Sequence, residues 1–72
     1  MPARFSAIER AAGTFGITVV AGGKHNKKLT RPGYRCYTIP AHNGGRSEIS
    51  DVYIAGLCRN FQIEEAEFRS RL

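Results

Sequence analysis

A Pro32-Gly33 pair near the middle of the chain is the feature that most restricts the fold. Pro-Gly is a strong turn signal, and residues 34–39 after it have the composition of a strand. A strand on one side of a tight turn needs a partner on the other, so we expect Asn26–Thr30 to be a strand although most of its residues are polar. The β-branched run at residues 17–20 predicts a third strand. Together these segments predict a three-stranded antiparallel sheet.

Helices are predicted on both sides of this sheet in the sequence. Residues 3–15 carry apolar side chains at helical spacing, with Gly16 placed to end the helix. Ser50 is a predicted N-cap for a second helix. Residues 64–72 predict a short C-terminal helix. The apolar stripes of the first two helices are Phe5, Ile8, Ala12 and Phe15, and Ile54, Leu57, Cys58 and Phe61.

The predicted fold class is α+β: an α-β-β-β-α sandwich with a short extra helix, resembling a double-stranded-RNA-binding domain. A chain of 72 residues has room for one core, so we expect residues 1–72 to form a single domain. Helices that precede and follow an antiparallel sheet pack on one of its faces. The other face then stays open to solvent or to a ligand.

Positive charge is concentrated in the middle of a chain whose net charge is +5. The rest of the chain, with five arginines and all six acids, is nearly neutral. Such asymmetry favours a polyanionic partner over a merely solvated surface. The six cations of the acid-free stretch 22–46 are Lys24, Lys27, Lys28, Arg31, Arg35 and Arg46.

His25 is the strongest candidate for catalysis because it follows Gly23-Lys24 at the predicted entry to the hairpin. Imidazole can take and give a proton near neutral pH. In RNA cleavage the 2′-hydroxyl of the substrate is the nucleophile, so the protein only has to move a proton, position the phosphate and neutralise charge. No metal and no cofactor are required for this chemistry. The alternative is an exposed polar loop histidine that contacts phosphate or nothing.

The remaining candidates are binding or assisting residues. His42 becomes a second acid–base group if its loop folds back toward His25; otherwise it is a loop histidine at a strand end. Lys27 and Lys28 alternate along their strand, so both cannot face one ligand. Tyr34 and Tyr37 are candidates for base stacking, with a core position favoured for Tyr37. The predicted RNA-binding set is Gly23, Lys24, Lys27, Lys28, Arg31 and Arg35.

Other classes of protein find little support in the sequence. The two cysteines, Cys36 and Cys58, form no CxxC pair, and no spacing predicts a zinc site, so both are expected to be small buried residues. No apolar run is long enough to span a membrane, and the N-terminal residues do not resemble a signal peptide. We therefore expect a cytoplasmic protein.

Short motifs in this order resemble the HicA-type toxins of bacterial toxin–antitoxin pairs over nearly the whole chain. Gly23-Lys24-His25 is similar to the Gly-Ser-His of that family, with Lys24 in place of serine. The segment 37–42, Tyr-Thr-Ile-Pro-Ala-His, is similar to its Thr-Val-Pro-x-His strand end. Glu48-Ile49 and the apolar positions that follow match the register of its last helix, and Glu65 to Phe68 resembles the acidic tail.

The resemblance implies a metal-independent mRNA endoribonuclease with the same dsRNA-binding-domain-like fold. It implies that His25 is the catalytic residue, that Gly23 enables the turn and that His42 is a neighbour in the site. It also implies a HicB-like antitoxin partner that covers the site, and RNA as the substrate. Two alternatives stay open: a catalytically inactive RNA-binding module on the same scaffold, and a pure protein-interaction domain.

Overall fold

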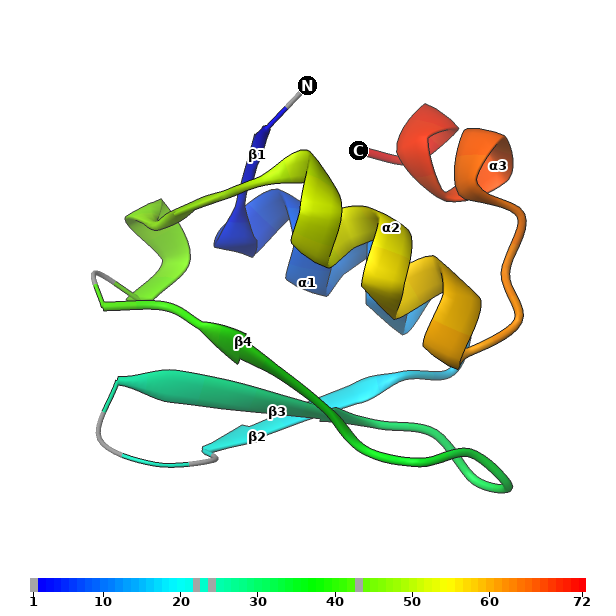
Figure 1. Cartoon of the computed structure of the whole chain (residues 1–72), viewed down its shortest axis with the longest axis horizontal. Coiled ribbons are helices and arrows are strands. Elements are labelled where there is room, and N and C mark those ends of the chain that lie inside the picture. The colour runs from blue at the N-terminus through cyan, green and yellow to red at the C-terminus, as the bar shows by residue number, and fades with distance from the viewer. Residues whose placement is uncertain (1, 22, 24, 43) are drawn as a thin grey trace.

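The structure, a computed structural model, describes residues 2–21, 23, 25–42 and 44–72. It is an α+β arrangement in which α1 and α2 lie on one side of the sheet β2-β3-β4, with α3 beside the chain ends (Figure 1). The predicted fold class is confirmed. The elements in chain order are β1 (Ala3–Arg4), α1 (Phe5–Gly13), β2 (Thr18–Ala21), β3 (Asn26–Thr30), β4 (Tyr37–Pro40), the 3-10 turn η1 (Gly44–Arg46), β5 (Glu48–Ile49), α2 (Asp51–Asn60) and α3 (Glu65–Ser70).

The sheet is antiparallel with β3 in the centre, as the hairpin signal predicts. Gly33 has a φ of +86°, and the amide of Tyr34 donates to the carbonyl of Arg31 at 3.0 Å, so the Pro-Gly pair forms the expected turn. The strand after it begins at Tyr37 rather than at Tyr34. Tyr34 leaves the ladder because its ring packs edge-on against Phe61, with 6.1 Å between centroids.

The core lies between the sheet and the helices, and both predicted stripes point into it. Leu29 and Ile39 project from the sheet toward the helices and are fully buried. Burial of one such side chain stabilises the fold by roughly 1.5–3 kcal/mol. The helices, with Phe61 at the C-cap of α2, supply most of the remaining apolar side chains that are fully or almost fully buried, namely Phe5, Ile8, Ala11, Ala12, Ile54, Leu57, Cys58, Phe61 and Phe68.

Helix α1 begins at Phe5, two residues later than its periodicity predicts. Ala3 and Arg4 are extended instead, because they pair antiparallel with β5 in a second, two-stranded sheet. α1 ends at Gly13, two residues before the predicted end, but Gly16 takes the expected left-handed position, with a φ of +79°, and its amide donates to Gly13. The amide of Ile17 donates to Ala12, which completes a Schellman motif.

Helix α2 begins after Ser50, the predicted cap, but the hydroxyl of Ser50 makes no capping hydrogen bond. The helix ends in a second Schellman motif, in which the amide of Ile63 donates to Cys58 at 2.8 Å and that of Gln62 to Arg59 at 3.3 Å. Gln62 occupies the left-handed position, with a φ of +55°. A side chain with a Cβ is strained there, so this end of α2 is less favourable than the glycine end of α1.

The two cysteines lie in different surroundings. Cys58 is buried in α2, and this burial raises the pKa of its thiol. Cys36 is exposed in the connection between β3 and β4, which corrects the expectation that both are buried. In the described part of the chain, none of the helices has the length and apolar character needed to cross a membrane.

Candidate functional site

The two histidines of the chain lie side by side at one end of the sheet. The ring centroids of His25 and His42 are 5.0 Å apart, with 41° between the ring planes. Both side chains are exposed, so a ligand can reach both. Hairpin formation therefore brings together the predicted catalytic residue and its predicted neighbour.

Strand pairing explains this proximity. The register of β3 and β4 sets Asn26 opposite Pro40, and one step further the amide of Ala41 donates to the carbonyl of His25 at 2.7 Å. Ala41 is buried, so the chain is held on the core at this point. His42 follows directly, so its ring lies beside that of His25 just beyond the ends of the two paired strands.

The turn η1 continues from this strand end. The amide of Gly44 donates to the carbonyl of Ala41 at 3.1 Å, so η1 is attached to the residue that anchors His25. η1 also packs on the start of α1, where a Cβ on Gly45 would lie 3.3 Å from the Cβ of Ser6. Arg46 is exposed at the end of η1, four residues after His42 in the chain.

Arg46 is absent from the predicted binding set although it belongs to the acid-free stretch. The sequence marks Arg46 only by its charge. Its position in space depends on the six-residue connection 31–36 and on the 3-10 turn η1, and neither can be predicted from the periodicity of apolar residues. Arg46 follows His42 by four residues, closer along the chain than Arg31 or Arg35. We therefore add Arg46 to the candidate binding residues, because it is exposed and follows His42 closely in the chain.

Lys27 and Lys28 lie on opposite faces of β3, as their alternation predicts. Lys28 is opposite Val20 on one side and Thr38 on the other, on the face of the sheet that no helix covers. Lys27 is opposite Ile39 and shares the helix-covered face, where it is half-buried. Of the two, only Lys28 belongs to the open face.

Arg31 and Arg35 are at the other end of the sheet, in the connection that joins β3 to β4. From His25 to Arg31 the chain advances six residues, about 20 Å along a strand. The guanidinium of Arg31 donates to the carbonyl of Phe61 at 2.9 Å and lies 4.8 Å from the centroid of the Tyr34 ring. Arg31 thus ties the hairpin to the end of α2 and is not brought to His25.

Gly23 and Lys24 precede His25. Gly23 is exposed, and a Cβ there would meet the side-chain nitrogen of Asn26 at 3.8 Å, an ordinary contact. Its φ is not in the left-handed region, so the backbone does not require glycine at this position. Lys24 lies outside the described residues.

Tyr37 and Tyr34 do not present free rings for base stacking. Tyr37 lies under α2, as expected of a core position, and its hydroxyl donates to the carbonyl of Tyr53 at 3.2 Å. Burial, with a smaller effect of the Tyr53 phenol, raises the pKa of Tyr37. Tyr34 packs edge-on against Phe61, so its ring is not free to stack on a base.

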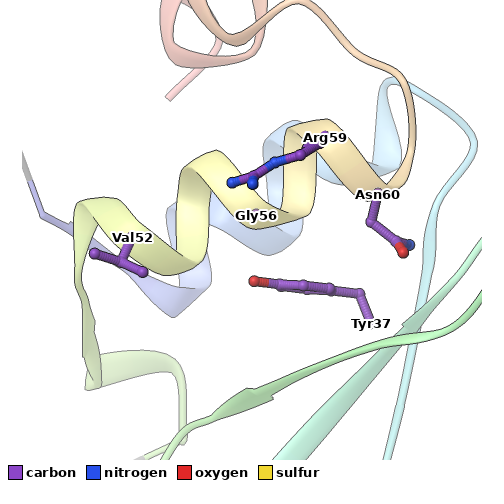
Figure 2. A pocket seen from close by; sticks show the side chains of 5 residues that line it. All are labelled: Tyr37, Val52, Gly56, Arg59 and Asn60. Carbon is purple, nitrogen blue, oxygen red and sulfur yellow. The ribbon is translucent and has the colours of Figure 1, made fainter.

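A shallow groove of about 430 Å³ lies between α2 and β4. Figure 2 shows the ring of Tyr37 beneath Gly56, with Arg59 extending along the helix above it and Val52 one turn nearer the start of α2. Asn60 closes the groove. Tyr37 is five residues from His42, about 16 Å along a strand, so this groove is separate from the histidine pair.

Within the described ranges, no three or more His, Cys, Asp or Glu side chains gather in a group that could hold a metal ion. Comparisons of the chain with protein-family models, with curated proteins and with solved structures find no match.

Proposed function

We propose that this chain is an endoribonuclease of the toxin–antitoxin type, which cleaves mRNA without a metal through His25. The observation that carries the proposal is an exposed imidazole, held at the open end of a small sheet, with a second imidazole 5.0 Å away. The resemblance of the motifs around His25 and His42 to those of HicA-type toxins supports the same conclusion.

The chemistry matches what the site offers. An RNA phosphodiester carries its own nucleophile, the adjacent 2′-hydroxyl, and needs a proton acceptor and positive charge around the phosphate. His25 is exposed and its main chain is fixed by the hydrogen bond from Ala41, so the imidazole starts from a defined point. Such a positioned base contributes typically 10²- to 10⁴-fold to the rate.

Positive charge for the phosphates comes from a smaller set than the sequence predicts. Lys28 stands on the open face of the sheet and Arg46 is exposed on η1, and we propose that both contact an RNA strand bound at the histidine pair. We assign Arg31 to the scaffold, because its guanidinium is already bonded to Phe61. RNA affinity should depend on Lys28 and Arg46 more than on Arg31.

A cleavage assay with a defined single-stranded RNA in the presence of EDTA tests the proposal. Wild type should produce fragments, and His25→Ala should reduce the rate by about 10²- to 10⁴-fold. Ala66→Ser, an exposed change on α3, is the matched control and should cleave like wild type. Equal melting temperatures of the three proteins would show that the loss is chemical.

Two outcomes would contradict the proposal that the chain cleaves RNA through His25. If wild type binds RNA with a salt-dependent affinity but releases no fragments, the chain is the alternative, an RNA-binding module on the same scaffold. If His25→Ala cleaves as fast as wild type, the activity belongs to another residue or to a contaminant.

A toxin also needs a partner. The histidine pair is exposed, so we propose that a HicB-like antitoxin covers it in the cytoplasm. Expression of the chain alone should arrest growth, and His25→Ala should relieve the arrest at equal protein level. Arrest by both proteins would separate toxicity from His25.

A further inference from the structure

The second imidazole has no structural task that the described residues reveal. No hydrogen bond joins the ring of His25 or His42 to any other described residue, and both side chains are exposed. The aromatic pair Tyr34–Phe61, in contrast, packs on the core. The chain is held at the histidines by a main-chain bond, from Ala41 to His25, which survives removal of either ring.

The spacing of the rings suits a shared substrate. Each ring comes from a different strand end, and the two rings are in tilted contact, with 41° between their planes, so both are within reach of one ligand. The two ring positions are separated by about the distance between neighbouring strands. One phosphodiester group with its attacking and leaving oxygens can therefore contact both imidazoles.

We propose that His25 and His42 form an acid–base pair, which makes His42 a second catalytic residue; this rests on the ribonuclease function proposed above. One neutral imidazole takes the proton of the 2′-hydroxyl while the bond from O2′ to phosphorus forms. The other, protonated, imidazole gives its proton to O5′ as the bond from phosphorus to O5′ breaks. The products are a 2′,3′-cyclic phosphate and a 5′-hydroxyl, and the two imidazoles have exchanged protonation states.

If one histidine is the general base and the other the general acid, replacing each should have a different effect on a substrate with a better leaving group. A purely structural role for either histidine predicts no such difference. An alcohol leaving group needs a proton, whereas a thiol is far more acidic and leaves as the thiolate. An RNA with sulfur in place of O5′ at the cleaved linkage therefore does not need the general acid, but it still needs the general base. Replacing the general acid should therefore hardly slow cleavage of the sulfur substrate, whereas replacing the general base should still slow it.

The experiment first maps one linkage that wild type cleaves in a synthetic RNA, and then compares oxygen and 5′-bridging sulfur at that linkage. His25→Ala and His42→Ala should each cleave the oxygen RNA about 10²- to 10⁴-fold more slowly than wild type. On the sulfur RNA, one of the two variants should come within about tenfold of wild type, and the other should stay slow. His42→Gln, which keeps a polar side chain of similar reach, should behave like His42→Ala.

The outcomes separate the pair from the function on which it rests. If wild type cleaves and His42→Ala is as fast, or if the sulfur RNA rescues neither variant or both, the pair is wrong and the ribonuclease stands. If wild type cleaves no linkage in any RNA, the ribonuclease proposal fails and the pair falls with it. Product ends other than a cyclic phosphate and a 5′-hydroxyl would also overturn the pair.

Discussion

Gly56 is the position where one added methyl group should disturb the attachment of the sheet to α2. A Cβ there would meet the hydroxyl of Tyr37 and lie 3.1 Å from its Cζ (Figure 2). Overpacking of this kind costs about 1–3 kcal/mol, and displacement of the hydroxyl loses its bond to Tyr53, worth about 0.5–1 kcal/mol at this exposed site. The higher helix propensity of alanine compared with glycine offsets this loss of stability by about 1 kcal/mol. We expect Gly56→Ala to lower the free energy of unfolding by about 1.5 kcal/mol and the Tm by roughly 6–12 °C.

A double-mutant cycle isolates the contact that causes this loss. Tyr37→Phe alone should cost about 0.5–1 kcal/mol, because it removes the bond to Tyr53. In the double variant the new methyl group meets only ring carbons, at 3.1 and 3.4 Å, which a shift of a few tenths of an ångström relieves. The double variant should therefore be more stable than the sum of the single changes by about 1 kcal/mol. Urea unfolding followed by circular dichroism measures all four proteins.

Gly13→Ala is the matched control for this cycle, because no atom lies within 4 Å of the Cβ it would add. It should leave stability unchanged or raise it by up to about 1 kcal/mol. Effects of Gly56→Ala and Tyr37→Phe that add to within about 0.5 kcal/mol would refute the reasoning, since the two side chains would then not touch.

Three further predictions concern binding, helix ends and pH. Arg31→Gln should destabilise the protein by about 1–2 kcal/mol and leave the salt dependence of RNA binding unchanged, whereas Lys28→Gln should lower the salt slope by about 0.7 at constant stability; the reverse pattern would contradict the assignment of both. Gln62→Gly should raise the free energy of unfolding by about 1 kcal/mol and Gly16→Ala should lower it by a similar amount, because both positions have a positive φ; equal signs in thermal melts would reject this. Burial raises the pKa of Tyr37, so the folded state favours the neutral phenol, and stability should fall as pH rises above about 10; denaturant titrations should show this loss in wild type and less of it in Tyr37→Phe.

Local signals in the sequence account for much of the fold. The Pro-Gly turn is enough to identify Asn26–Thr30 as a strand although it is mostly polar, because a turn of this kind requires a partner strand. The pairing of β1 with β5 has no such signal. Ala3 and Arg4 look like the first turn of a helix, and only their pairing with Ile49 and Glu48, 46 and 44 positions away, makes them extended. Long-range pairing of two-residue strands is beyond any periodicity argument.

In the candidate site, too, local sequence signals predict some features, whereas others depend on contacts between distant parts of the chain. His25 is recognisable from the residue types around it, but its contact with His42 depends on the strand register, and the wide connection at residues 31–36 leaves that register undetermined by turn type. For Arg31 the sequence suggests a role that its position in the structure does not support. Its charge predicts a phosphate contact, while the carbonyl of Phe61, 30 residues away, takes its guanidinium.

Because one thiol is exposed and the other is buried, the rates at which the two cysteines react with a covalent label can report on opening of the structure. A maleimide dye should attach to exposed Cys36 while Cys58 stays protected by its position in α2 and its raised pKa. Slow incorporation of a second label would then count openings of that helix, and its rate would measure local opening in the native ensemble. Labelling kinetics with and without RNA would show whether occupation of the histidine end is felt on the far side of the core.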